Sequence, residues 1–124
     1  MTDPAVPTPP PPAAAPVLAS IDDFKRLSFK VGVVISAEDH PNADRLLVLK
    51  VDIGEGSPRQ LIAGIKGAYQ ASDVVGKRVV VVANLKPAML RGVESQGMVL
   101  AASDASGLSL LSLERPLQPG SPVK

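Results

Sequence analysis

The stretch Phe29-Lys30-Val31-Gly32-Val33-Val34-Ile35-Ser36 decides the expected fold. Its odd-numbered residues are Phe, Val, Val and Ile, and they alternate with Lys, Gly, Val and Ser. An apolar residue at every second position is typical of a β-strand. The stretch from Leu47 to Ile53 repeats the pattern, with Leu, Leu, Val and Ile separated by Val, Lys and Asp. The sequence therefore predicts two neighbouring strands here.

The residues that follow extend this all-β pattern. Gly54 to Pro58 is rich in turn residues, so Gln60 to Ala63 can return as a third strand. A short helix is expected from Gln70 to Val75. Lys77 to Ala83 is a run of β-branched residues whose uninterrupted valines suggest burial on both faces. Further on, Asp104-Ala105-Ser106-Gly107 indicates the turn of a hairpin, whose strands are Gly97 to Ala102 and Leu108 to Leu113.

Five or six short strands with one short helix, in about a hundred residues, predict a small β-barrel. The chain has 124 residues, which suits one compact domain with a tail. We expect the domain to occupy residues 21–124. Residues 1–20 include seven Pro and five Ala and are expected to form a disordered tail or linker. A ligand for an SH3- or WW-type domain is the alternative interpretation of this segment.

Composition excludes several classes of function. The chain has no Cys and one His, so a disulfide framework, a thiolate site and a His-cluster metal site are all excluded, and no cofactor is expected. Its 13 Lys plus Arg nearly balance 12 Asp plus Glu, unlike the charge of a histone-like protein. The apolar run from Val79 to Ala83 is far too short to span a bilayer. Asp3 stands where a signal peptide would be basic, so a cytoplasmic location is expected.

Catalysis is not supported by the sequence. His40 lies in the polar segment Asp39-His40-Pro41-Asn42, close to Asp44. A catalytic triad would also require a positioned nucleophile and an oxyanion site, and no nucleophile elbow or phosphate-binding glycine loop is present. We therefore expect His40 to be solvated or to order its loop. The paired acids Asp22-Asp23 and Glu38-Asp39 are interpreted as a helix start and a strand end.

RNA binding is the second candidate function. With only Phe24, Phe29 and Tyr69 as aromatic residues, the chain has little surface on which bases could stack. Any RNA contact should therefore depend on phosphates, 2′-hydroxyls and shape. Ordinary surface charge is the alternative explanation for the cations found where strands meet loops, which are Lys30, Arg45, Lys50, Lys77, Arg78, Lys86 and Arg91.

Two segments of the sequence favour RNA binding over ordinary surface charge. Residues 84–98 read Asn-Leu-Lys-Pro-Ala-Met-Leu-Arg-Gly-Val-Glu-Ser-Gln-Gly-Met, which we interpret as a Pro-containing loop with two cations followed by a turn. Residues 39–46 read Asp-His-Pro-Asn-Ala-Asp-Arg-Leu. Together they closely resemble the tRNA-binding domain family. That family includes the C-terminal domain or β subunit of methionyl-tRNA synthetase, free-standing tRNA-binding proteins and a bacterial secretion chaperone.

The resemblance covers about residues 21–124 and implies an all-β fold: an OB-fold five-stranded barrel with a short helix and a C-terminal strand extension. It implies a homodimer that binds the outer corner of tRNA. Cations would contact phosphates, neutral side chains would donate to sugar or phosphate, and Met98 would lie beside the ribose or in the core. The tRNA-binding residues so implied are Lys30, Asn42, Arg45, Asn84, Lys86, Arg91, Ser95 and Met98.

The chain departs from the family pattern in places. Met89 stands where the family commonly has Lys, and Ser28-Phe29-Lys30 replaces a more usual Asp-Leu-Arg. Ser72 is left as the candidate N-cap of the short helix.

No aminoacylating domain fits this length, so we expect a non-catalytic accessory domain, a β subunit of methionyl-tRNA synthetase or a free-standing tRNA-binding protein. The alternative is a dimeric secretion chaperone that binds extended polypeptides. Five leucines give the expected homodimer a physical basis, because they exceed what one edge strand normally buries; they are Leu108, Leu110, Leu111, Leu113 and Leu117.

Overall fold

The computed structural model describes residues 17–124. The expected tail therefore lies largely outside the described residues. In chain order, the elements are α1 (Ile21–Lys25), β1 (Phe29–Asp39), β2 (Leu47–Asp52), β3 (Arg59–Ala63), α2 (Ala71–Val74), β4 (Arg78–Val82), β5 (Ala88–Leu90), β6 (Val93–Ser95), β7 (Met98–Val99), β8 (Ala101–Asp104), β9 (Gly107–Leu110) and β10 (Pro122–Val123).

The main sheet is antiparallel and has the strand order β3-β2-β1-β4-β7. Its five strands curl into a nearly closed barrel of the OB type, which confirms the predicted fold class. The short strand β10 pairs with the beginning of β1, and the hairpin of β8 and β9 forms a separate two-stranded sheet. These two features are the C-terminal extension that the sequence predicted.

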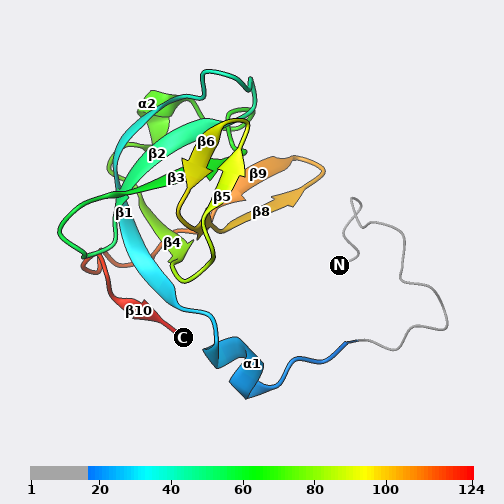
Figure 1. The fold of residues 1–124 in the computed structure, drawn as a ribbon, viewed down its shortest axis with the longest axis vertical. Helices are drawn as coiled ribbons and strands as arrows, with labels where there is room; N and C mark the ends of the chain where they lie inside the picture. Colours follow the sequence, from blue (N-terminus) through cyan, green and yellow to red (C-terminus); the bar gives the residue numbers. More distant parts are fainter. Residues whose placement is uncertain (1–16) are drawn as a thin grey trace.

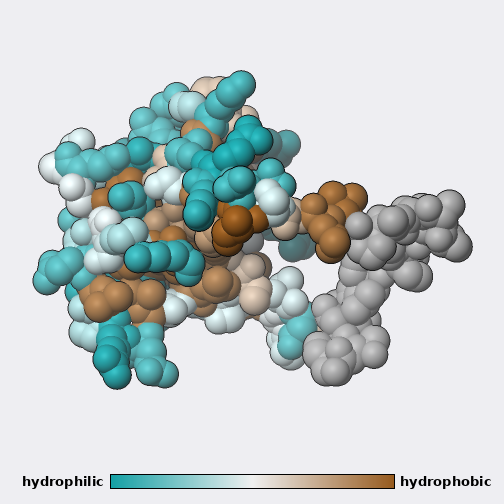
Figure 2. Space-filling model, turned by 90° about the horizontal axis from the view of Figure 1, so that it is seen from below, coloured by the Kyte–Doolittle hydropathy of each residue, from teal (hydrophilic) through white to brown (hydrophobic). Residues whose placement is uncertain are grey.

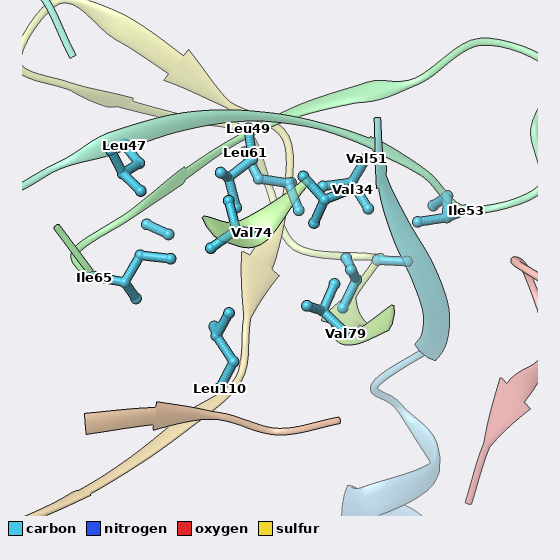
Figure 3. Close-up of a cluster of buried hydrophobic side chains, with 13 residues drawn as sticks. Val34, Leu47, Leu49, Val51, Ile53, Leu61, Ile65, Val74, Val79 and Leu110 are labelled. Atoms are coloured by element: carbon cyan, nitrogen blue, oxygen red, sulfur yellow. The ribbon is translucent and has the colours of Figure 1, made fainter. Parts of the chain in front are cut away.

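The core lies inside the barrel, and alternate residues of β2 are among its most deeply buried members. Leu47, Leu49 and Val51 have no exposed surface and point toward residues of the neighbouring elements (Figure 3). The four valines of β4 are all buried, which confirms the predicted burial of both faces of this strand. Small aliphatic side chains therefore fill the interior, as expected for a chain with so few aromatic residues.

The register of β1 differs from the simple alternation that predicted it. Val34 lies in the core and Ile35 is half exposed, so it is the even-numbered residues that face inward here, and a β-bulge between Val34 and Ser36 then shifts the pairing with β2 so that Ala37 packs against the core. Gly32 also faces the core, because a Cβ at this position would lie 2.5 Å from Cγ1 of Val51. The bulge thus changes the face that β1 presents to the core at the end where the loop to β2 begins.

Helix α1 lies outside the barrel, at the bottom of Figure 1, and buries none of its residues. The Ser20 hydroxyl accepts from the Asp23 amide (3.1 Å), and the Asp23 carboxylate accepts from the Ser20 amide (3.0 Å). This capping box confirms the helix start that Asp22-Asp23 predicted. The rings of Phe24 and Phe29 stack at 5.3 Å. Figure 2 shows this end of the molecule, where apolar surface interrupts the polar surface.

Two smaller predictions are wrong. Ser72 is not the cap of α2, because Gln70 has the extended backbone of an N-cap and donates its amide to Asp73 Oδ2 (2.9 Å), so the helix begins one residue before Ser72. The strand predicted at 97–102 is divided between β7, which pairs with β4, and β8, which pairs with β9. The chain leaves the barrel edge at Leu100, whose amide still donates to Val80.

The second strand of the predicted hairpin also ends early, since β9 stops at Leu110. Of the five leucines invoked for a dimer, Leu110 belongs to the barrel core and Leu108 packs against it. Leu111 and Leu117 remain exposed. Two of the five leucines are therefore covered within the chain, and the homodimer stays a prediction.

Candidate nucleic-acid interface

Residues 84–98 contain a hairpin that the sequence analysis treated as a loop and a turn. Strands β5 and β6 pair from Ala88 with Ser95 to Leu90 with Val93. The two residues between them, Arg91 and Gly92, have φ values of 54° and 88°. Positive φ at both positions is the geometry of a tight hairpin turn, and Gly92 adopts it without strain. The hairpin lies against the outside of the barrel (Figure 1).

The tip of this hairpin is bonded to the loop between β1 and β2. Nε2 of His40 donates to the Leu90 carbonyl (2.9 Å), and the Asn42 side-chain amide donates to the Arg91 carbonyl (3.2 Å). The Asn42 main-chain amide donates in turn to Nδ1 of His40 (2.9 Å). Two residues of one loop therefore bind two consecutive carbonyls at the hairpin tip.

The base of the hairpin is bonded to β3. The Gln60 side chain donates to the Glu94 carbonyl (2.7 Å), and the Gln60 amide donates to Oε1 of Gln96 (3.0 Å). The Ile62 amide donates to the buried hydroxyl of Ser95 (3.0 Å). These side chains satisfy the edge of β3 where no regular ladder continues.

Arg59 joins three loops at the same end of β3. Its guanidinium binds both carboxylate oxygens of Glu55, at 2.9 and 2.8 Å, and it also donates to the carbonyls of Ala83 and Gln96. Hydrogen bonding from Arg59 holds the pKa of the Glu55 carboxyl below its ordinary value. Because its donors are engaged within the protein, Arg59 serves to hold these loops together.

The predicted site residues fall into two groups. Asn42 and Arg91 meet at the hairpin tip, where Asn42 binds Arg91, and Arg45 follows in the same loop but lies beside residues 64–68 and the β8–β9 turn. The others lie near the hairpin base or the strands beside it; they are Lys30, Asn84, Lys86, Ser95 and Met98. The hairpin connects the two groups, and each of its strands has three residues, which corresponds to about 10 Å.

Three predicted cations have the exposure that a phosphate contact needs. Arg45, Lys86 and Arg91 are exposed. The two ion pairs within residues 17–124 are Glu55 with Arg59 and Asp39 with Lys66, so neither occupies these cations. Met98 is also half exposed, which settles its placement in favour of the surface rather than the core.

Ser95 and Asn84 differ from the expectation of free donors. The Ser95 side chain is 3% exposed, and its hydroxyl accepts from Ile62 and donates to the Gly97 carbonyl (2.9 Å). Asn84 accepts from the Ser28 amide (2.7 Å) and donates to the Arg26 carbonyl (2.6 Å), and so holds the link between α1 and β1. The structure therefore gives Ser95 no access to RNA, and Asn84 already uses both ends of its amide.

Lys30 lies apart from the hairpin tip, near the beginning of β1. It borders a cavity of about 400 Å³ whose lining includes Glu55, Arg59 and Asn84. The side chain is partly exposed. Lys30 could therefore contact phosphate only at the end of the barrel opposite the loop that carries Asn42.

Neither catalysis nor metal binding gains support. His40 is 5% exposed, so it is not solvated, and both ring nitrogens bind main-chain groups, in agreement with the predicted loop-ordering role. Residues 17–124 contain no group of three potential metal-ligating side chains. In the same part of the chain, no helix has the length and hydrophobicity to cross a membrane.

Sequence reasoning missed the residues that hold the hairpin in place, namely Arg59, Gln60 and Gln96. Each makes contacts with residues 24 to 37 positions away. A Gln or Arg beside a turn carries no local signal of such a partner. The closest signal in the sequence is Gly92, because a glycine favours a turn, but a single glycine does not predict a hairpin.

Comparisons with known proteins agree with this geometry. The family model described as "Putative tRNA binding domain" matches residues 29–122. A methionine–tRNA ligase of Methanococcus aeolicus is 51% identical over 106 residues, which are 86% of this chain and 16% of that protein. The corresponding protein of Thermococcus kodakarensis is 48% identical over 105 residues, which are 85% of this chain and 14% of that protein. The chain thus spans only about a seventh of the length of these relatives.

Two solved structures are similar over nearly their whole length. A MetRS-related protein from Pyrococcus horikoshii superposes with a TM-score of 0.80 at 33% identity, covering 87% of this chain and 99% of that one. The chaperone CsaA of Bacillus anthracis superposes with a TM-score of 0.78 at 29% identity, covering 87% and 100%. The barrel fold of this chain therefore occurs both in a MetRS-related protein and in a chaperone.

Proposed function

The chain belongs to the tRNA-binding domain family, and on that premise we propose that it binds folded tRNA through the β5–β6 hairpin and the loop between β1 and β2. The observation that carries the proposal is the direct bonding of this loop to the hairpin tip, which brings Asn42 beside Arg91. Exposed Arg45, in the same loop as Asn42, and exposed Lys86, just before β5, supply further cations for RNA. A guanidinium can bind two phosphate oxygens at once, which suits Arg45 and Arg91 to the RNA backbone.

The chemistry of this surface favours recognition of shape over sequence. None of the three aromatic residues lies on the hairpin, so splayed bases would find no stacking platform there. Phosphate contacts position an RNA without reading its bases. We therefore propose little dependence on the anticodon, with Asn42 donating to sugar or phosphate and Met98 making apolar contact beside the ribose.

The family is that of a non-catalytic binding module, although the relatives quoted above are enzymes. We propose that the chain supplies tRNA affinity to methionyl-tRNA synthetase as an accessory domain or β subunit, or acts as a free-standing tRNA-binding protein in the cytoplasm. Co-purification from the source organism distinguishes these roles, since a synthetase subunit would retain the catalytic chain and a free-standing protein would retain tRNA alone.

Competition binding tests tRNA recognition itself. Labelled tRNA bound to the full chain is displaced by unlabelled folded tRNA or by single-stranded RNA of equal length. We expect folded tRNA to compete more strongly, because only the folded molecule presents phosphates in a fixed arrangement. Equal competition by the single strand would contradict the proposal. Log affinity should also fall linearly with log salt concentration, as counterion release requires.

The structural similarity to the chaperone CsaA favours a second candidate, the binding of extended polypeptides. Exposed Met89, Leu90 and Met98 lie near the cations of the hairpin, and such a mixed surface can bind apolar peptides. Adding an extended apolar peptide to the tRNA complex tests this candidate. Displacement would indicate a shared face, whereas peptide binding without tRNA binding would reverse the order of the two proposals.

We also propose a homodimer, on the evidence of helix α1 rather than of the five leucines. Helix α1 buries no residue within the chain, and its Ile21 and Phe24 are exposed, as is Leu27 after it. An apolar helix face of this kind is a suitable surface for a second copy. Sedimentation at micromolar concentration should give a dimer, and a monomer would remove this part of the proposal.

A further inference from the structure

His40 is a buried polar residue that the proposed tRNA contact does not use. It follows the last residue of β1, and its main-chain amide donates to the Leu46 carbonyl (3.1 Å), which closes the loop before β2. The ring is 5% exposed. Its contacts are to main-chain groups of its own loop and of the hairpin tip, 50 residues further along the chain.

The two ring contacts assign one tautomer. Nδ1 lies 2.9 Å from the Asn42 amide, which can only donate, so Nδ1 must be the acceptor. Nε2 lies 2.9 Å from the Leu90 carbonyl, which can only accept, so Nε2 carries the proton. A single neutral imidazole thus links the fold of the loop to the position of the hairpin.

The hairpin needs such a link at its tip. A two-stranded hairpin is marginally stable alone, and the three residues of β5 are all exposed. Gln60, Gln96 and Ser95 fix only its base. At the other end, His40 holds the Leu90 carbonyl and Asn42 holds the carbonyl of Arg91 itself. Without the imidazole, the turn could rotate about its base while the barrel core stayed intact.

We propose that His40 is a positioning residue for tRNA binding: its imidazole orders Asn42 through Nδ1 and places Arg91 through Nε2, so that both face the RNA together. The inference rests on the proposed function, because it assigns a role to residues of that same surface. It adds that the geometry of the surface depends on a buried side chain that does not touch RNA.

Two substitutions separate the two ring nitrogens. In His40→Asn, the side-chain oxygen can accept from the amide two residues on, as in an Asx turn, but the side chain is too short to reach Leu90. In His40→Gln, the longer amide can still donate to the Leu90 carbonyl. The pair therefore compares loss of the hairpin contact with its retention, at a similar cost in burial.

Far below the melting temperature, we expect His40→Asn to weaken tRNA binding. The loss of affinity should be no larger than that of Arg91→Ala. The salt slope should fall by about 0.7–0.9, the change for one lost phosphate contact. Amide hydrogen exchange should accelerate at residues 88–95 and remain unchanged in β2. His40→Gln should restore much of the affinity and slope. In an Arg91→Ala background, His40→Asn should have little further effect, because both changes remove the same contact.

The outcomes distinguish this inference from the proposed function. If Arg91→Ala weakens binding but His40→Asn binds like the parent, His40 is merely structural and the inference is overturned. Equal weakening by Asn and Gln, or strictly additive losses with Arg91→Ala, would also overturn it. If Arg91→Ala itself binds like the parent, the proposed hairpin surface fails and the inference fails with it.

Discussion

The barrel core and the β5–β6 hairpin are stabilised by different kinds of contact. In the core, Leu47, Leu49 and Val51 are fully buried among apolar neighbours, and removing their surface from water is the dominant favourable term. In the hairpin, the residues of β5 are exposed, and its orientation depends on hydrogen bonds made by polar side chains of other elements. Apolar packing therefore sets the stability of the molecule, and polar contacts set the position of its candidate RNA surface.

This difference has a consequence for mutations. A change in the core should affect folding, and binding should fall only because less protein is folded. A change in the polar contacts should affect binding geometry while most of the fold survives.

The largest expected effect comes from Leu49→Ala. Leu49 has no exposed surface, so its truncation leaves a cavity that the neighbouring strands fill only in part. We expect the free energy of unfolding to fall by about 2–5 kcal/mol. Denaturant unfolding followed by circular dichroism measures this loss. At a temperature where the variant is still folded, its tRNA affinity should equal that of the parent, and a large binding defect there would contradict the division of roles.

Ser95→Ala should have the next largest effect, and it acts at the boundary between the two regions. The substitution removes the hydroxyl that accepts from the Ile62 amide, and so leaves a buried donor unpaired. We expect a loss of about 1–3 kcal/mol in the free energy of unfolding. Ser36→Ala, at an exposed position on β1, is the matched control and should change stability by less than about 0.5 kcal/mol. Equal stability of the two variants would show that the bond from Ile62 contributes nothing.

The difference between apolar packing in the core and polar contacts at the hairpin also explains which features could be predicted from the sequence. The barrel strands, the burial of β4 and the helix start at Asp22-Asp23 follow from local patterns, because period-two alternation and capping involve residues close in sequence. The bulge in β1 was not predictable in this way, since β2 and the core determine where the register shifts.

The candidate site was only partly predictable for a physical reason. The resemblance of two sequence motifs to the family pointed to Arg45, Lys86 and Arg91, and all three are exposed in the structure. Their role in tRNA binding stays a prediction. The burial of Ser95 could not be inferred, because its partner Ile62 lies 33 residues away on an edge that is completed by side chains. The hairpin of 88–95 was missed because its strands have three residues each, too few for a periodic pattern.

Arg91→Ala tests the hairpin without touching the core. The side chain is exposed, so we expect the free energy of unfolding to change by less than about 0.5 kcal/mol. The tRNA affinity should fall, and the salt slope should decrease by about 0.7–0.9 as one phosphate contact is lost. Salt titrations of the parent and the variant measure both quantities.

Arg115→Ala removes an equally charged, exposed residue from the C-terminal segment and is the matched control. The expected slope and affinity of this variant are those of the parent, apart from a small general loss. If both arginine variants lose the same affinity, net charge rather than the hairpin surface governs RNA binding.

Glu55→Gln should have the smallest effect, and its pH dependence shows which region it serves. Arg59 lowers the pKa of the Glu55 carboxyl in the folded protein relative to the ordinary value of 4.5. A lowered pKa means that the ion pair contributes stability above that ordinary value and loses it as the pH falls through the folded-state pKa. The pair is partly exposed, so the contribution at neutral pH should be about 0–1 kcal/mol. The difference between parent and variant should therefore be present at pH 7 and vanish once Glu55 is protonated in both the folded and unfolded chains. Denaturant unfolding across this range measures the difference, with Glu38→Gln, at an exposed position of β1, as the control.

Because Arg59 still donates to Ala83 and Gln96 in the Glu55→Gln variant, the hairpin base should stay in place and tRNA affinity at pH 7 should not change. A marked loss of affinity would mean that Glu55 is needed to hold Arg59 against the hairpin, and that this polar region is less independent of the surrounding loops than its hydrogen bonds indicate.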